Sequence, residues 1–303
     1  MKIKAILEQK PTVSFEVFPP KQWDKIEGTK AVVKEMVKSH PAFMSVTYGA
    51  AGTTSGFTTE IAREILDDGV TPLAHLTCLT STRDKIHQVV AELQENGIEN
   101  ILALRGDIPR DFQFPAEQYF EHAYQLVNEI RTLADFTHAS DLVRFIKENG
   151  DFCVGGACYP EVHPESKNRV EDLEHLKQKV DCGVDFLTTQ MFFDNTVFYN
   201  FREMCAIKGI DVPLIAGIMP ITKASQLERT VKLSGCSLPT KFVKIVERFG
   251  DRDDAMQQAG IVYAAEQIID LMANGVDHIH IYTMNKPDVA GAIVRELGSI
   301  IHE

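Results

Sequence analysis

The chain repeats one pattern from end to end: a short run of β-forming residues, usually followed by a segment with helical periodicity. The eight β-forming runs are Val13–Phe18, Phe43–Thr47, Pro72–Thr77, Asn100–Arg105, Phe152–Cys158, Asp185–Met191, Pro213–Met219 and His278–Tyr282. Strands and helices that alternate in this way form a parallel sheet with the helices outside it. Eight repeats at a spacing of roughly 30 residues predict an α/β fold, a closed (β/α)8 TIM barrel in a single domain.

Apolar residues at helical spacing occupy several of the intervening segments. These segments are Lys30–Ser39, Thr59–Asp68, Thr82–Asn96, Ala139–Glu148, Val170–Asp181 and Ala255–Asn274. The stretch 108–135 is longer than the repeat requires, and it contains a further predicted helix at Ala116–Leu133. It keeps apolar residues, so we expect an elaboration of one domain over 1–303 rather than a linker.

An open, doubly wound sheet is the structural alternative to the barrel. Such a sheet usually carries a glycine-rich phosphate turn after its first strand. Here the sequence Phe18-Pro19-Pro20-Lys21 follows the first run, and neither a G-x-G-x-x-G sequence nor a Walker A lysine loop occurs anywhere. The missing signatures favour the barrel.

Composition excludes several classes of protein. Of the 303 residues, 44% are hydrophobic and 24% are charged, as in a folded domain and unlike a disordered chain. The formal net charge of −12 argues against a nucleic-acid partner, and no apolar run approaches the roughly 20 residues of a membrane span. None of the six cysteines forms a Cys-x-x-Cys pair. We therefore expect reduced, buried thiols in a cytoplasmic protein without a signal peptide.

In a (β/α)8 barrel the active site lies at the C-terminal ends of the strands. Polar residues at these predicted ends include Glu16, Thr47, Tyr48, His75, Arg105, Asp107, Tyr159, Glu161, His163, Glu165, Gln190 and Lys286. One such residue is a weak signal, because polar groups within strands are often satisfied core groups. Their convergence on one rim predicts an active site.

Glu16 is the most informative of these residues. It lies between Phe15 and Val17, and a carboxyl that loses solvation has a raised pKa. A carboxyl that keeps its proton near neutral pH suits general-acid catalysis. The sequence supports equally well a buried ion pair between Glu16 and a strand-end base such as Arg105. Asp107 can orient a ligand, or it can be a turn residue.

Three of these polar residues have side chains that can bind a metal ion. Glu161, His163 and Glu165 alternate along the chain, but prolines interrupt them and no second cluster has metal-ligand spacing. We therefore expect a role without a metal for these three residues. His278 and His280 share one face of the last predicted strand, and we expect them to pack inside the protein.

Eight short motifs resemble those of a known family. They are Ser-Phe-Glu-Val-Phe-Pro-Pro, Ser-Val-Thr-Tyr-Gly-Ala, Ala-His-Leu-Thr-Cys, Ala-Leu-Arg-Gly-Asp, Tyr-Pro-Glu-Val-His-Pro-Glu, Thr-Gln-Met-Phe-Phe-Asp, Ala-Gly-Ile-Met-Pro and Tyr-Thr-Met-Asn, between residues 14 and 285. In these motifs the chain resembles the methylenetetrahydrofolate reductases, flavoenzymes of one-carbon metabolism and methionine biosynthesis. Because the sequence ends at Glu303, we expect the bacterial type, with the catalytic domain alone.

The resemblance implies a barrel that holds FAD non-covalently and uses NADH or NADPH as co-substrate. The cofactor-binding positions that it implies are Thr47, Tyr48, Ala50, His75, Arg105, Gly106, Asp107, His138, Ala139, Tyr159, His163, Ser166, Asp172, His175 and Lys179. Of these, His75, Arg105 and Lys179 can face the charge of the pyrophosphate. The implied contacts with the folate are Asp107, Gln190, Gln226 and Lys286.

The resemblance also implies a ping-pong reaction, in which the nicotinamide reduces the flavin and leaves before the folate binds in its place. The implied catalytic residues are Glu16, which protonates the departing ring nitrogen, and Asp107, which stabilises cationic character. Thr230 stands where some relatives have Phe, and Lys286 stands where Arg occurs in relatives. We expect a homo-oligomer with no nucleic-acid or membrane partner.

Two other functions remain open. The chain can be another FAD barrel oxidoreductase, similar to a proline dehydrogenase, or a flavin electron-relay subunit of a larger complex.

Overall fold

The computed structural model describes residues 1–8, 11–48, 55–78, 82–106, 136 and 138–301. The predicted elaboration 108–135 with its helix Ala116–Leu133 lies outside the described residues, as do the two predicted site residues Ala50 and Asp107.

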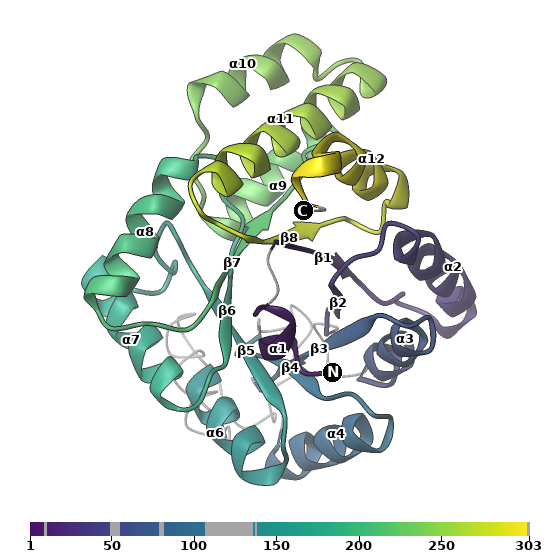
Figure 1. Cartoon of the computed structure of the whole chain (residues 1–303), viewed down its shortest axis with the longest axis vertical. Helices are drawn as coiled ribbons and strands as arrows, with labels where there is room; N and C mark the ends of the chain where they lie inside the picture. Colours follow the sequence, from purple (N-terminus) through teal and green to yellow (C-terminus); the bar gives the residue numbers. More distant parts are fainter. Residues whose placement is uncertain (9–10, 49–54, 79–81, 107–135, 137, 302–303) are drawn as a thin grey trace, which may run out of the picture.

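Eight parallel strands form a closed barrel (Figure 1). They are β1 (Thr12–Val17), β2 (Phe43–Val46), β3 (Thr71–Thr77), β4 (Asn100–Leu104), β5 (Cys153–Cys158), β6 (Phe186–Thr189), β7 (Leu214–Ile218) and β8 (His278–Tyr282). Each strand pairs with the next along the chain, and β8 pairs with β1. The predicted (β/α)8 barrel is therefore confirmed, with every strand end within two residues of its predicted position.

The helices surround the barrel in chain order, except the first, which lies within the ring (Figure 1). They are α1 (Ile3–Ile6), η1 (Trp23–Lys25), α2 (Ile26–Val37), α3 (Ser55–Asp67), α4 (Arg83–Glu95), α6 (Ala139–Asn149), α7 (Arg169–Asp181), α8 (Asn195–Ile207), α9 (Ala224–Ser234), α10 (Thr240–Phe249), α11 (Asp253–Ala273), α12 (Pro287–Leu297) and η2 (Gly298–Ile300). The six predicted helices within the described residues are present, although α2 and α3 begin four residues earlier than predicted. Among the described helices, none has the length and apolarity that crossing a membrane requires.

The main core fills the space between the strands and the helices. Strand residues such as Phe15, Val46 and Ile281 are fully buried there against helix residues such as Met36 and Ile268. Parallel strands covered by helices are buried on both faces, so their apolar runs are nearly continuous. The six cysteines are free, and five of them are buried, as expected from the sequence.

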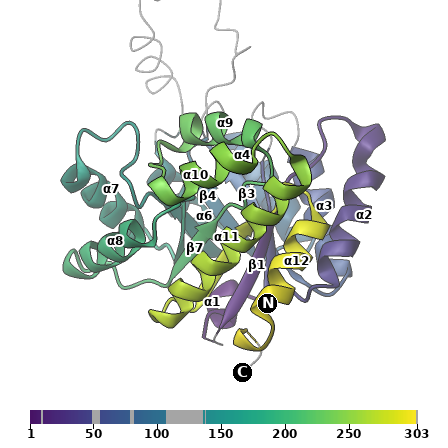
Figure 2. The same cartoon turned by 90° about the horizontal axis from the view of Figure 1, so that it is seen from above.

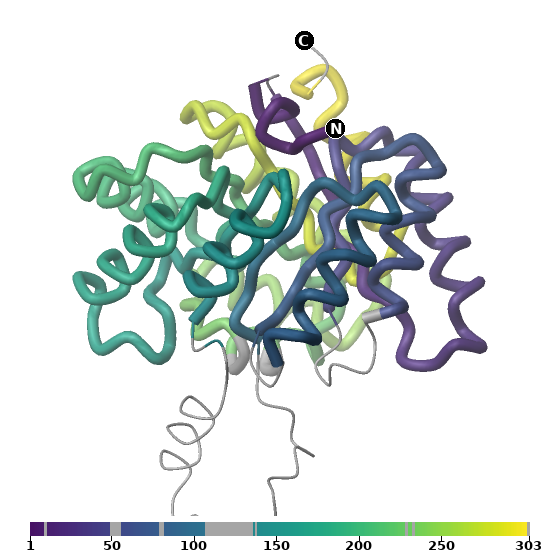
Figure 3. Tube along the Cα trace, turned by 90° about the horizontal axis from the view of Figure 1, so that it is seen from below, coloured from purple at the N-terminus to yellow at the C-terminus, as the bar shows by residue number. Residues whose placement is uncertain are grey.

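The short helix α1 closes the N-terminal end of the barrel. Ile3, Ile6 and Leu7 pack against the strand residues Phe43 and Phe186 in a separate apolar cluster. Figure 2 places α1 at the end of the barrel opposite α9, and Figure 3 shows the purple N-terminal segment at that same end. Because the bottom of the barrel is filled, a ligand has access from the C-terminal ends of the strands.

Candidate active site

A cavity of about 800 Å³ lies at the C-terminal ends of the strands. All eight strands, or the residues that directly follow them, contribute to its wall. Its volume falls in the range of about 300–1,000 Å³ that is usual for sites of small ligands. The cavity therefore lies where a (β/α)8 barrel carries its active site.

Most of the predicted site residues line this cavity. They are Glu16, Thr47, Tyr48, His75, Arg105, Gly106, Ala139, Tyr159, His163, Lys179, Gln190 and Gln226, and Thr230 lies in the wall as well. His138, Ser166, Asp172, His175 and Lys286 do not line it, and His138 and His175 are exposed. The fold thus brings together residues from positions 16 to 226 of the chain, as expected from the barrel topology.

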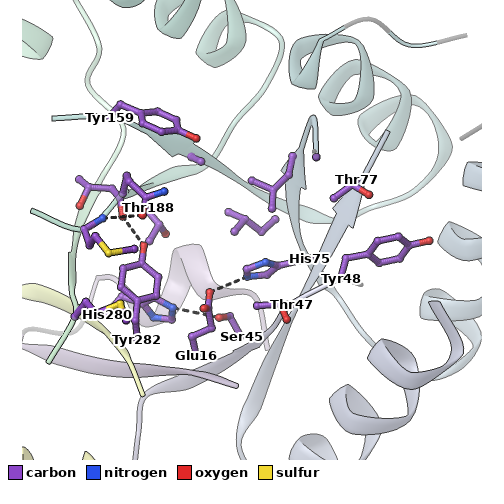
Figure 4. Close-up of a pocket in the computed structure, with 18 of the residues that line it drawn as sticks. Glu16, Ser45, Thr47, Tyr48, His75, Thr77, Tyr159, Thr188, His280 and Tyr282 are labelled. Carbon is purple, nitrogen blue, oxygen red and sulfur yellow. Dashed lines mark hydrogen bonds and ion pairs between the residues drawn. The ribbon is translucent and has the colours of Figure 1, made fainter. Parts of the chain in front are cut away.

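Glu16 lines the cavity together with His75 and Tyr282 (Figure 4). Its neighbours in β1, Phe15 and Val17, are fully buried in the core on the other face of the strand. The Glu16 side chain is 21% exposed, and burial raises the pKa of its carboxyl to about 8. Arg105 pairs with Glu165 and not with Glu16. Of the two alternatives for Glu16, the structure therefore supports a carboxyl that keeps its proton near neutral pH and not an ion pair with Arg105.

The imidazole of His75 faces the Glu16 carboxyl (Figure 4). Its Nε2 atom lies 3.7 Å from Oε2 of Glu16, and it has no hydrogen-bond partner among the described residues. Burial lowers the pKa of His75 to about 3, so the ring is neutral at physiological pH. A protonated carboxyl and a neutral imidazole carry no net charge. This pair can therefore be buried together without the cost of burying an ion.

A buried polar network lies below Glu16. His280 Nδ1 is 2.8 Å from Ser14 Oγ, and its Nε2 is 3.2 Å from Ser45 Oγ. Because Ser14 Oγ donates to the carbonyl of Ile279, it accepts from His280 Nδ1–H, and Ser45 donates to Nε2. Burial lowers the pKa of His280 to about 3. The neutral ring is thus satisfied on both sides, which confirms the prediction that His280 packs inside the barrel.

Contacts between β6, β7 and β8 shape the opposite wall. Tyr282 Oη donates to the carbonyl of Thr189 at 2.6 Å, and Thr189 Oγ1 accepts from the backbone N–H of Gly217 at 2.9 Å. A Cβ atom on Gly217 would lie 2.4 Å from the Thr189 carbonyl oxygen. These three residues fix the strand end that carries Gln190. The sequence interpretation assigned them no such role, although a glycine within a strand is a recognised sign of close backbone approach.

Positive charge gathers at the β4 and β5 side of the cavity. Arg105 forms a two-pronged pair with Glu165, and the Lys179 ammonium group donates to the carbonyl of Ala157. Burial lowers the pKa of Lys179 and that of His163, and the nearby Arg105 cation lowers the pKa of His163 further. Both basic side chains can bind an anion, and the Glu165 carboxylate is the anion that Arg105 binds here.

The segment after β5 holds three residues that alternate like metal ligands. Glu161 accepts hydrogen bonds from the backbone N–H of Ser237 with both carboxylate oxygens, at 2.9 Å each. His163 Nδ1 accepts from the backbone N–H of Glu165, whose carboxylate pairs with Arg105. Each of the three side chains therefore has a different partner. Among the described residues, no cluster of three metal-ligating side chains exists.

The two residues implied in folate-tail binding are connected through Thr222. Lys286 Nζ donates to Thr222 Oγ1 at 2.7 Å. The side-chain oxygen of Gln226 accepts from the backbone N–H groups of Thr222 and Lys223 at the start of α9. Gln226 lines the cavity, whereas Thr222 and Lys286 do not. Gln226 thus also supports the first turn of α9.

Comparison with known proteins identifies the family. The family model for methylenetetrahydrofolate reductase matches residues 2–137 and 130–298. A 5,10-methylenetetrahydrofolate reductase from Pectobacterium carotovorum is 32% identical, over 97% of this chain and 92% of that protein. The Escherichia coli enzyme of the same name is 34% identical, over 94% of this chain and 90% of that protein. The enzyme from Arabidopsis thaliana named methylenetetrahydrofolate reductase (NADH) 1 is 34% identical, and this chain spans 50% of its length.

A solved structure agrees on the fold. An uncharacterised protein from Clostridium thermocellum, described as binding two copies of 5-methyl-5,6,7,8-tetrahydrofolic acid, superposes with a TM-score of 0.63 at 14% identity, over 99% of this chain and 100% of that one. At this identity the likeness supports the fold alone. The family match, in contrast, spans nearly the whole sequence, and the chain belongs to the methylenetetrahydrofolate reductase family.

Proposed function

We propose that this chain reduces 5,10-methylenetetrahydrofolate to 5-methyltetrahydrofolate, with a nicotinamide cofactor as electron donor and FAD as the carrier between them. The relatives that match over more than 90% of this chain carry the name of this activity. The observation that carries the proposal is the Glu16 carboxyl, buried in the cavity with its pKa raised to about 8. The reaction requires such a proton donor.

The cavity has the donor set that FAD would need. Arg105 and Lys179 supply positive charge for the pyrophosphate, and Tyr159 and His163 line the same side. At the other side, the buried Nε2 atom of His75 has no partner among the described residues and can bond to a ligand. Bound FAD would supply a carrier that accepts a hydride from the nicotinamide and passes it to the folate.

Other residues extend this cofactor site beyond the cavity wall. Asp172 accepts a hydrogen bond from Ser166 Oγ at 3.1 Å, and its carboxylate can also accept from a ribose or ribityl hydroxyl. Thr47 and Tyr48 line the cavity after β2, at the side where the isoalloxazine would lie. His138 and His175 are exposed, so we assign them to the outer, adenine end of the site.

Glu16 supplies the proton in the proposed reaction. The C–N bond of the bridging ring of the folate breaks, the proton of Glu16 goes to the departing nitrogen, and an iminium remains at the carbon. That carbon then accepts the hydride. One proton and one hydride are thus added in total, and Glu16 regains its proton from solvent. A carboxyl with a pKa near the working pH suits both steps.

Gln190 and Gln226 would hold the folate. Gln190 directly follows β6. Its side-chain oxygen accepts a hydrogen bond from the backbone N–H of Met191 at 3.0 Å, so the side-chain N–H groups of Gln190 remain for a ligand. Gln226 and Lys286 lie toward the α9 side, where the glutamate tail would leave the cavity. Because nicotinamide and folate would meet Gln190 in turn, we expect ping-pong kinetics.

Anaerobic mixing tests the proposal. The purified protein should carry FAD, whose absorbance near 450 nm disappears on mixing with NADH or NADPH and returns on mixing with methylenetetrahydrofolate. A flavoprotein of the proline-dehydrogenase kind would not respond to the folate. A relay subunit would be reduced poorly by either nicotinamide. A protein that contains no flavin, and takes up none, contradicts the proposal.

A further inference from the structure

The ion pair between Arg105 and Glu165 lies at the edge of the cavity, on the side that is proposed for the pyrophosphate. Both terminal nitrogens of the Arg105 guanidinium donate to the two oxygens of the Glu165 carboxylate, with an Nη2–Oε1 distance of 2.8 Å. Arg105 lines the cavity, and its side chain is 24% exposed. The pair is therefore at the edge of the site, where a ligand can reach it.

A carboxylate and a phosphate present the same face to a guanidinium. Each offers two oxygens that accept two parallel N–H bonds, and the geometry is nearly the same. A pyrophosphate that binds Arg105 in this way needs the N–H groups that Glu165 uses in the described structure. The carboxylate also carries the same sign of charge as the pyrophosphate, so the two repel each other at short range.

The chain presents Glu165 to Arg105 on an ordered turn. The backbone N–H of Glu165 donates to His163 Nδ1 at 3.1 Å, and that of Ser166 donates to the His163 carbonyl at 2.9 Å. The Glu165 side chain is 45% exposed, so it can turn toward solvent while the backbone of this turn stays in place. Leaving Arg105 exposes the carboxylate to water and does not bury an unpaired charge.

We propose that Glu165 occupies the place of a cofactor phosphate on Arg105, so that FAD binds by exchange with this carboxylate. The proposal takes FAD as the cofactor and so rests on the proposed function. Glu165 then sets how tightly the flavin is held. It is a specificity residue that acts on the diphosphate part of FAD and not on its ring.

Titration of the flavin-free protein with two ligands tests this exchange. FAD carries the diphosphate, whereas riboflavin has the same ring and lacks it. For Glu165→Gln and Glu165→Ala we expect the Kd for FAD, measured by quenching of flavin fluorescence, to fall by about two- to fivefold, the range for a partly exposed charged pair. The Kd for riboflavin should remain unchanged.

Two controls separate this effect from others. Glu174→Gln removes one negative charge from the outer face of α7, where Glu174 pairs with Lys208, and it should bind FAD like the wild type. In an Arg105→Gln background the Glu165 substitution should have a smaller effect on the Kd for FAD, because the competition for Arg105 is lost and only the repulsion between the carboxylate and the pyrophosphate remains.

The outcomes are distinct. An unchanged or higher Kd for FAD in both Glu165 variants, with wild-type melting temperatures, overturns the exchange and leaves the FAD proposal standing. An equal gain in affinity for riboflavin also overturns the exchange. A wild-type protein that binds neither ligand overturns both the exchange and the choice of FAD as cofactor.

Discussion

At the scale of single residues, the surroundings of Glu16 decide its chemistry. A carboxyl in water has a pKa near 4.5, and burial raises that of Glu16 to about 8. His75 does not reverse this effect, because burial keeps its imidazole neutral. The proposed proton donor therefore needs no cationic partner, and its proton is available over the physiological pH range.

Replacing Glu16 should separate the two half-reactions. We expect Glu16→Gln to leave reduction of the flavin by the nicotinamide nearly intact, since a hydride transfer to the flavin does not need this proton. Reduction of the folate should slow by about 10²–10⁴-fold, the usual contribution of a general acid. Stopped-flow absorbance measures each step separately. An equal loss in both half-reactions would remove Glu16 from the acid role.

The raised pKa also makes stability depend on pH. The pKa of Glu16 is higher in the folded protein than in the unfolded chain, so its contribution to stability is full below about pH 4.5 and is lost as the pH rises toward about 8. Glu16→Gln carries no such penalty. We expect the variant to gain stability relative to the wild type between pH 5 and 8, by on the order of 3 kcal/mol. Urea unfolding at several pH values measures this gain. A difference in unfolding free energy between the variant and the wild type that does not change with pH contradicts the prediction.

The sequence predicts some of these residues better than others. A lone carboxylate between Phe15 and Val17 already indicates a raised pKa, because these apolar neighbours mark a strand that is buried on both faces. The ion-pair partner of Arg105, in contrast, cannot be predicted from its neighbours in the chain. Glu165 lies 60 residues away, and both Glu16 and Glu165 were chemically suitable. Only the folded arrangement decides between them.

At the scale of elements, the ends of β6, β7 and β8 act as one unit. Tyr282 and Gly217 both contact Thr189, the last residue of β6, and Gln190 follows it directly. Sequence periodicity locates each strand but not these contacts, which join residues far apart in the chain. For the same reason the sequence located β8 to the residue but did not predict the hydrogen bond from Tyr282 to the Thr189 carbonyl.

A methyl group on Gly217 should disturb this unit. A Cβ atom would lie 2.4 Å from the Thr189 carbonyl oxygen and 2.7 Å from Tyr282 Oη, so the strand ends must move apart. We expect Gly217→Ala to lower the free energy of unfolding by about 1–3 kcal/mol and to raise the KM for the folate through Gln190.

The matched control for this substitution is Gly28→Ala. Gly28 lies within α2, and nothing is within 4 Å of its added Cβ atom. There alanine should stabilise the protein by about 0.5–1 kcal/mol, because it favours the helix. Chemical denaturation and steady-state kinetics check both variants. A Gly217→Ala protein as stable as the wild type would show that the strand ends tolerate the extra atom.

At the scale of the whole molecule, the two ends of the barrel have separate tasks. The C-terminal ends of the strands carry the polar cavity. Helix α1 lies at the opposite end (Figure 2), and its apolar side chains pack against the strands there. The repeat in the sequence predicts the barrel and the end at which the site lies. It does not predict α1, because four residues are too few for a periodic signal. Substitutions in α1 should therefore change stability without changing ligand binding in the cavity.

Truncating a buried side chain of α1 tests this separation. Ile3 is fully buried, so Ile3→Ala leaves a cavity and should lower the free energy of unfolding by about 2–5 kcal/mol. Ile207→Ala removes the same atoms at a side chain that is 82% exposed, and it should change stability by less than about 0.5 kcal/mol. Urea unfolding measures both effects. The Kd for FAD of folded Ile3→Ala protein should equal that of the wild type, since α1 lies at the far end of the barrel. A weakened Kd would mean that the two ends are coupled through the strands.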